Sequence, residues 1–135
     1  MNISNKPFLI NFKETGNSNL GYISIAEKDT LPFEPKRIYW TYYTPKDVER
    51  GNHSHINLEQ ILVAVCGKIE LTIETIEGNS YNFILDSPDT GVYIPRLCWR
   101  KMKYSHNAVQ MCIASIEYDE KDYIRDYQAF KSYKR

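Results

Sequence analysis

The feature that most constrains the fold of this chain is a series of short apolar or alternating runs, each broken by turn residues, from Phe8 to Ile116. A period of two places successive side chains on opposite faces of a strand, and many short runs of this kind are typical of a β-sandwich or barrel. The turn Glu77-Gly78-Asn79 between two of the runs indicates a β-hairpin. We expect strands over residues 8–12, 22–26, 37–43, 60–66, 68–76, 81–85, 91–94, 98–102 and 109–116.

The C-terminal segment has a different pattern. Asp119 is a residue type that caps helices, and an acidic first turn follows it. Apolar side chains then recur at helical spacing, at Tyr123, Ile124, Tyr127 and Phe130. We therefore expect an all-β domain closed by one short C-terminal α-helix, whose apolar stripe covers the core. The longest expected loop, residues 44–52, leads directly into two histidines and would form the rim of a cavity.

Composition narrows the class of protein. The chain has 135 residues, 42% apolar and 25% charged, which fits a single domain spanning residues 1–135. Basic and acidic residues balance at 17 each, so no nucleic-acid partner is expected. No apolar run approaches the ~20 residues of a membrane span, and the polar start carries no signal-peptide pattern. Cys66, Cys98 and Cys112 lie in apolar runs and are expected to be buried thiols of a cytoplasmic protein.

The segment that carries chemistry contains two histidines, His53 and His55, and Glu59, followed by a strand and a glycine. In an extended strand, residues two apart point to the same side, so both imidazoles can converge on one ligand atom. This H-x-H-x-x-x-E spacing is the first half of the cupin pattern. A metal-binding cupin would add a histidine from a later strand, but Arg100 stands in that part of the pattern. A guanidinium repels a divalent metal, so no metal site is expected.

Without a metal, the two imidazoles are suited to proton transfer near pH 7. The alternative is a structural pair held by hydrogen bonds. Arginines at 37, 50 and 100 lie on or beside expected strands, where a charged group needs solvent or an anionic partner. Arg37 and Tyr39 also alternate onto one face. These residues indicate a pocket for an anionic ligand, although an ordinary surface ion pair is the alternative for each arginine.

Several motifs, taken in order, resemble one known family almost from end to end. They are Pro32-Phe33, Lys36-Arg37-Ile38-Tyr39, Arg50-Gly51-Asn52-His53-Ser54-His55, Leu58-Glu59-Gln60, Leu85-Asp86-Ser87-Pro88, Gly91-Val92-Tyr93, Trp99 with Met102, Ala114-Ser115, and Tyr118-Asp119-Glu120 with Asp122-Tyr123-Ile124-Arg125. The chain resembles the sugar-nucleotide 3,4-ketoisomerases of the WxcM-like cupin group. The resemblance implies a cupin-type double-stranded β-helix, or jelly roll, that forms a homodimer and needs neither metal nor other cofactor.

The implied reaction converts dTDP-4-dehydro-6-deoxy-D-glucose into a dTDP-3-dehydro-6-deoxyhexose through an enediol, for use in surface polysaccharides such as O-antigen. By motif, His53 and His55 are the expected acid–base pair and Tyr39 the pocket tyrosine that assists them. The expected substrate-binding residues are Arg50, Arg100, Arg37 and Trp99. Arg100 favours the gluco over the galacto product slightly, whereas Asn52 is expected to have little effect.

Two other functions remain open at this point. One is a non-catalytic cupin that binds a sugar nucleotide and controls a partner protein. The other is a related dTDP-keto-sugar epimerase, which abstracts a proton beside the same keto group. The residues also leave open which histidine is the base, which aromatic side chain stacks on the nucleotide base, and whether the nucleotide is dTDP or UDP.

Overall fold

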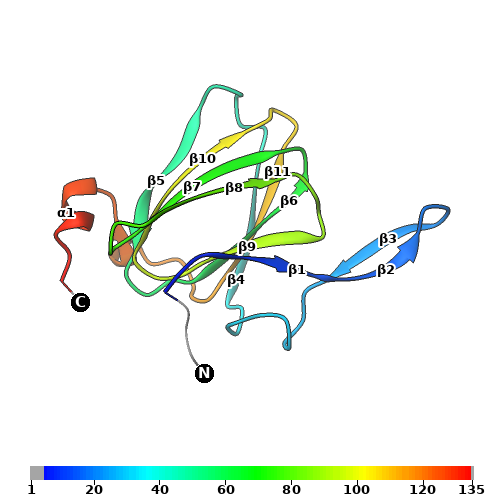
Figure 1. Cartoon of the computed structure of the whole chain (residues 1–135), viewed down its shortest axis with the longest axis horizontal. Coiled ribbons are helices and arrows are strands. Elements are labelled where there is room, and N and C mark those ends of the chain that lie inside the picture. The colour runs from blue at the N-terminus through cyan, green and yellow to red at the C-terminus, as the bar shows by residue number, and fades with distance from the viewer. Residues whose placement is uncertain (1–4, 135) are drawn as a thin grey trace.

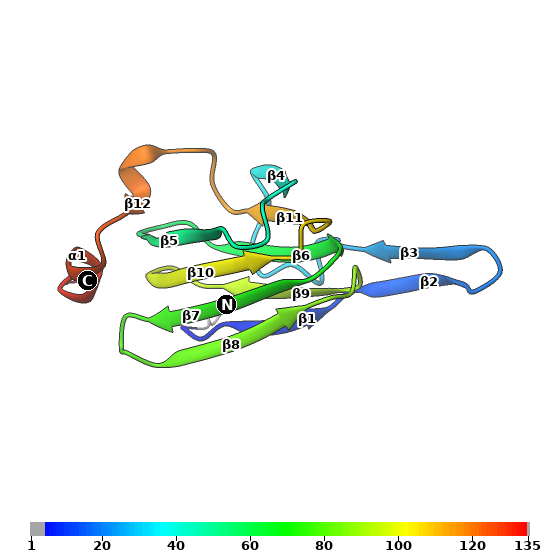
Figure 2. The same cartoon turned by 90° about the horizontal axis from the view of Figure 1, so that it is seen from above.

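A computed structural model describes residues 5–134, in which two five-stranded antiparallel sheets face each other as a jelly roll (Figures 1 and 2). The first sheet has the order β1 (Phe8–Asn11), β9 (Thr90–Ile94), β6 (Gln60–Cys66), β11 (Val109–Ala114) and β4 (Arg37–Tyr42). The second has the order β12 (Tyr123–Ile124), β5 (Glu49–His55), β10 (Cys98–Tyr104), β7 (Ile69–Thr75) and β8 (Ser80–Leu85). The all-β prediction is confirmed.

The main core lies between the two sheets, and β6 is buried on both of its faces from Gln60 to Ala64. Leu62 and Ala64 point into the main core, whereas Ile61 and Val63 pack with Phe12 in a second cluster. A strand that is covered on both sides has no polar face, which accounts for the unbroken apolar run in this part of the sequence.

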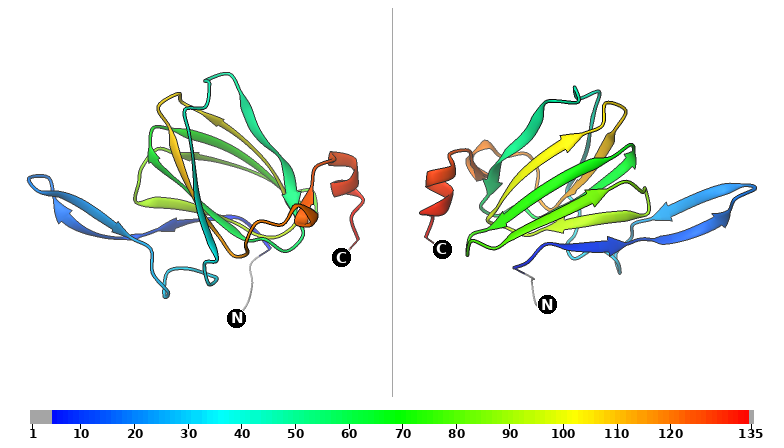
Figure 3. Two further views of the ribbon diagram at one scale, coloured as in Figure 1. Left: turned by 180° about the vertical axis from the view of Figure 1, so that it is seen from behind. Right: turned by 45° about the horizontal axis from the view of Figure 1, so that its top comes forward.

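A two-stranded arm projects from the barrel on the side away from the C-terminal helix (Figure 3). It consists of β2 (Lys13–Asn17) and β3 (Gly21–Ile25), of which only β3 was expected. Its apolar side chains Leu20, Tyr22 and Ile23 are all more than half exposed.

Other expectations need smaller corrections. The hairpin at Glu77-Gly78-Asn79 is confirmed, because β7 pairs with β8 across it. The loop expected at residues 44–52 is shorter, because β5 already begins at Glu49. Cys98 and Cys112 are buried as expected, but Cys66 is exposed. The reason is that β9 pairs with β6 only as far as Val63 and leaves the end of that strand uncovered.

The C-terminal helix was expected to begin directly after Asp119, but it begins later in the chain, at Tyr127. Residues Glu120–Asp122 form a single 3₁₀ turn, and β12 then pairs with β5. The α-helix α1 spans only Tyr127–Lys131 and starts from Asp126, whose carboxylate accepts a hydrogen bond from the backbone N–H of Ala129 (2.8 Å). Strand pairing and buried hydrogen bonds to Asp122 outweigh the local helical pattern here.

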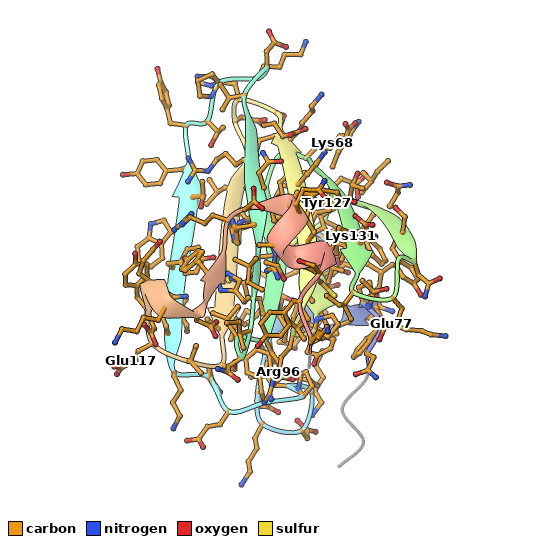
Figure 4. The ribbon with its side chains drawn as sticks, turned by 90° about the vertical axis from the view of Figure 1, so that its left-hand side faces the viewer. Lys68, Glu77, Arg96, Glu117, Tyr127 and Lys131 are labelled. Carbon is orange, nitrogen blue, oxygen red and sulfur yellow. The ribbon has the colours of Figure 1, made fainter. Side chains whose placement is uncertain are left out.

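The helix is fastened to the second sheet by polar contacts. Tyr127 and Lys131 project from α1 (Figure 4), and both bind the carboxylate of Glu74 on β7, at 2.7 and 3.0 Å. Phe130 is fully buried beneath the helix. In residues 5–134, no helix is long and apolar enough to cross a membrane.

Candidate active site

A β-bulge in β5 brings two functional side chains, Arg50 and His53, to one side of the strand. His53 lies opposite Arg100 and Gly51 opposite Lys101, so Asn52 is an extra residue without a partner on β10. Gly51 and Asn52 both have positive φ, 93° and 54°, a backbone conformation that glycine and asparagine tolerate. The bulge shifts the alternation of the strand, so that Arg50 faces the same cavity as His53. Asn52, expected to have little effect, is part of the bulge.

The cavity, of about 370 Å³, lies between β4, at one edge of the first sheet, and β5 of the second. It is lined by Arg37, Tyr39, Thr41, Arg50, Gly51, His53, Met102, Tyr104, Gln110, Tyr123 and Arg125. Within residues 5–134, neither Arg37 nor Arg50 forms an ion pair with a carboxylate. Two arginines without such a partner, on a polar wall, fit an anionic ligand.

Hydrogen bonds fix the tautomer of both imidazoles. The Nδ1 atom of His53 lies 3.0 Å from the carbonyl oxygen of Gly51, and Nδ1 of His55 lies 3.2 Å from the Asp122 carboxylate. Both partners only accept, so each Nδ1 carries the hydrogen and each Nε2 has a free lone pair. The Nε2 atom of His55 is buried without a hydrogen-bond partner. Both side chains are therefore set up as proton acceptors.

Asp122 holds His55 in place from the C-terminal segment. Its carboxylate also accepts hydrogen bonds from the backbone N–H groups of Asn57 (2.7 Å) and Leu58 (3.1 Å), and the residue is only 4% exposed. Next to it, the ring of Tyr123 lies 4.3 Å from that of His55 and 5.1 Å from that of His53. This segment thus forms one wall of the site.

Burial sets the charge states of the site. It lowers the pKa of His53 to about 4, with a smaller contribution from the positive charge of Arg100. The same two causes lower the pKa of His55, and burial raises the pKa of Tyr39. At neutral pH the imidazoles are uncharged and can accept a proton, whereas the phenol keeps its proton and can donate it in a hydrogen bond.

Arg100 lies behind the cavity wall and is 1% exposed. Its guanidinium donates to the side-chain oxygen of Gln60 and to the carbonyl oxygen of Cys98 (3.1 Å). Gln60 in turn donates from its amide nitrogen to the hydroxyl of Tyr39 (2.9 Å) and to the sulfur of Cys112 (3.2 Å). Arg100 is therefore connected to the cavity through Gln60 and Tyr39.

The structure brings most of the expected site residues together. His53, Tyr39, Arg37 and Arg50 line the cavity, and His55 lies directly behind His53, with ring centroids 4.9 Å apart.

Trp99 is not brought to the cavity. It neighbours the inward-facing Arg100 on β10, so it points to the opposite face, where it packs against Tyr127 and Phe130 of α1. Glu59, considered as a metal ligand, instead accepts a hydrogen bond from the hydroxyl of Tyr93 (2.6 Å), which packs in the second cluster.

Asp122, Tyr123, Arg125 and Gln60 belong to the site but were given no role from the sequence. All four lie in motifs noted above, so only their roles were missed. Asp122 stands in an acidic stretch that is typical of a helix start, and its partner His55 is 67 positions away along the chain. No local pattern could have revealed that contact.

The fold and the site together define a cupin-type jelly roll whose cavity combines paired imidazoles, a tyrosine and arginines. The family model described as WxcM-like, C-terminal (FdtA) matches residues 5–135, and the chain belongs to this family.

Individual relatives agree with this assignment. A TDP-4-oxo-6-deoxy-alpha-D-glucose-3,4-oxoisomerase from Aneurinibacillus thermoaerophilus is 39% identical over 93% of this chain and 90% of its own length. A 3,4-ketoisomerase structure from Helicobacter canadensis is 35% identical, with a TM-score of 0.86 over 93% of this chain and 94% of that one. A sugar 3,4-ketoisomerase from Thermoanaerobacterium thermosaccharolyticum in complex with TDP is 33% identical, also with a TM-score of 0.86, over 93% and 91%.

Proposed function

We propose that the protein is a sugar-nucleotide 3,4-ketoisomerase that converts dTDP-4-dehydro-6-deoxy-D-glucose into its 3-dehydro isomer. The observation that carries the proposal is the His53–His55 pair, with both Nε2 lone pairs free. His53 lines a cavity that also holds arginines without ion-pair partners, and His55 lies directly behind it. The names of the relatives supply the substrate class. Arg37 and Arg50 are placed to bind the diphosphate, because a guanidinium forms paired hydrogen bonds to such oxygens.

The chemistry matches these groups. A base takes the proton from C3, and the electron pair of that C–H bond forms the C3=C4 double bond while O4 gains a proton. The resulting enediol then loses the proton of O3 as the C3 carbonyl forms, and C4 takes up a proton. No net proton is gained or lost, so a group that first accepts and later returns a proton is sufficient.

We assign the removal of the C3 proton to His53, because this imidazole lines the cavity, whereas His55 is almost fully buried. His55, oriented by Asp122 and packed behind His53, takes part in proton transfer through His53, because its own Nε2 is buried and does not line the cavity. Tyr39 donates its hydroxyl hydrogen to the oxygen that becomes negative, because it stays protonated at neutral pH.

Arg100 acts from behind this wall through Gln60 rather than by touching the substrate. We propose the gluco product for this chain, on the presence of arginine at this position.

We further propose that residues 1–135 act as one domain and form a homodimer. Ile38, Trp40 and Tyr42 on the outward face of β4 are each more than half exposed, as are the apolar side chains of the β2–β3 arm. Exposed apolar area and open strand edges of this kind are covered when two copies associate. The buried free thiols of Cys98 and Cys112 fit a cytoplasmic enzyme of surface-polysaccharide synthesis.

The test is an incubation of the purified protein with dTDP-4-dehydro-6-deoxy-D-glucose, followed by ¹H and ¹³C NMR. The proposal expects a carbonyl at C3 and a new C4–H whose coupling constants report the gluco configuration. Saturable binding without any product would favour the non-catalytic cupin. Light scattering of the same sample tests the dimer.

A further inference from the structure

We propose that Gln60 is a positioning residue that fixes the direction of the Tyr39 hydroxyl, so that its hydrogen points into the cavity toward the substrate. The inference rests on the proposed function for its consequence in catalysis. Its structural part rests only on the hydrogen bonds that connect Arg100, Gln60 and Tyr39.

The orientation of the Gln60 amide is determined by Arg100. A guanidinium has only donors, so the group of Gln60 that faces it must be the carbonyl oxygen Oε1. Arg100 is held in turn by the carbonyl oxygen of Cys98 and is 1% exposed, so no water competes for this place. The amide nitrogen of Gln60 must therefore point the other way.

The direction at Tyr39 follows from this. The amide nitrogen of Gln60 lies 2.9 Å from the Tyr39 oxygen and can only donate to it. The Tyr39 oxygen is thus an acceptor in this bond, and its own hydrogen has to be directed elsewhere. Tyr39 lines the cavity, where the oxygens of a keto sugar would provide the acceptor. The sulfur of Cys112 is a competing acceptor for this hydrogen, because the Tyr39 hydroxyl also lies in hydrogen-bond contact with it. It is a weak acceptor and already accepts from the amide nitrogen of Gln60 (3.2 Å), so it needs a control.

A carboxylate at position 60 reverses this arrangement while keeping its shape. In Gln60→Glu, the side chain still accepts from Arg100, but its second oxygen can no longer donate to Tyr39. The Tyr39 hydroxyl then donates to the introduced carboxylate instead of to the substrate. In Gln60→Met, by contrast, both hydrogen bonds are lost, but the Tyr39 hydroxyl stays free to turn toward the substrate.

The two variants separate a positioning role from a structural one. Positioning predicts that kcat falls further in Gln60→Glu, by ~10-fold or more, than in Gln60→Met, with KM little changed in both. A structural role predicts the opposite order, because Gln60→Glu keeps the partner of Arg100. In a Tyr39→Phe background, Gln60→Glu should lower kcat no further. Cys112→Ala removes the competing sulfur and should leave kcat within about twofold of the parent, since a weak acceptor contributes little.

A measurement without substrate keeps the inference testable if Gln60→Glu does not fold or the parent shows no turnover. The tyrosine Raman doublet reports whether a phenol donates or accepts, and the parent-minus-Tyr39→Phe difference spectrum isolates Tyr39. We expect an acceptor signature in the parent and its loss in Gln60→Met. Two results would overturn the role of Gln60. One is a parent in which Tyr39 gives a donor signature toward the protein. The other is a Gln60→Glu change that lowers kcat equally in the presence and in the absence of the Tyr39 hydroxyl. Absence of parent turnover overturns the proposed function instead.

Discussion

The bulge in β5 makes Gly51→Ala the most informative single change for the architecture of the site. A Cβ atom at Gly51 would lie 2.7 Å from the carbonyl oxygen of Arg100 and 3.2 Å from the sulfur of Met102. The first contact is with backbone, and it lies in the pairing of β5 with β10 that aligns His53. The residue also has a φ of +93°, which costs alanine about 1–2 kcal/mol.

Gly78 offers a matched control for the backbone strain. Its φ is +94°, but a Cβ there would meet only the flexible end of Lys131, at 3.9 Å. We expect Gly78→Ala to lower the free energy of unfolding by about 1–2 kcal/mol, which is the conformational cost alone. Gly51→Ala adds about 1–3 kcal/mol for the overlap and should therefore cost about 2–5 kcal/mol.

Urea denaturation followed by tryptophan fluorescence measures the difference between the two variants. Gly51→Ala should also lower kcat/KM by ~10²-fold, because a displaced β5 moves both Arg50 and His53. Gly78→Ala should leave turnover unchanged, since its turn lies outside the cavity. Equal stability of the two variants, or full activity of Gly51→Ala, would refute the conclusion that the bulge positions these side chains.

Three further predictions concern the chemistry. His53→Asn and His55→Asn should each lower kcat by ~10²–10⁴-fold with the fold retained, as checked by circular dichroism, and near-parental turnover in both variants would exclude the pair as the acid–base groups. The pKa of His53 is about 4 in the native state and about 6.5 in the unfolded chain. As pH falls, the unfolded chain therefore binds the proton first. Up to about 3 kcal/mol of the free energy of unfolding, present above pH 6.5, is lost toward pH 4. Urea denaturation at several pH values in this range should show that the free energy of unfolding falls less steeply with pH for His53→Asn than for the parent. Identical slopes of the free energy of unfolding against pH would contradict the lowered pKa. Exhaustive chelation should leave turnover intact, because Glu59 binds Tyr93 rather than facing the imidazoles, and activity restored only by a divalent metal would support the metal-binding alternative.

Most of the strands and the histidine pair could be predicted because their signals are local, whereas β2, β5 and β12 were not among the expected strands. The alternation of apolar and polar residues indicated the strands. The i, i+2 spacing placed His53 and His55 on one face, and in the structure their ring centroids are 4.9 Å apart. The turn at Gly78 was equally readable, because glycine and asparagine mark such a hairpin.

What could not be predicted depends on contacts between distant parts of the chain. Tyr123 and Ile124 have helical spacing, but they pair with β5 because His55 and Ser54 offer an open strand edge. The placement of Trp99 is different, because a local rule already excludes it from the site: adjacent residues on a strand face opposite ways, and Arg100 faces inward. The β-bulge that turns Arg50 toward the cavity comes from one unpaired residue, Asn52. The alternation of apolar and polar residues in the sequence does not reveal this bulge.

The most direct test of the proposed reaction is NMR of dTDP-4-dehydro-6-deoxy-D-glucose incubated with the protein in D₂O, with His53→Asn in parallel. Proton return to C4 by an imidazole predicts that the carbonyl moves to C3, that deuterium appears at C4, and that the variant forms almost no labelled product. Deuterium at C3 or C5 without movement of the carbonyl would identify an epimerase and contradict the ketoisomerase assignment. Equal labelling by the parent and by His53→Asn would contradict the role of His53.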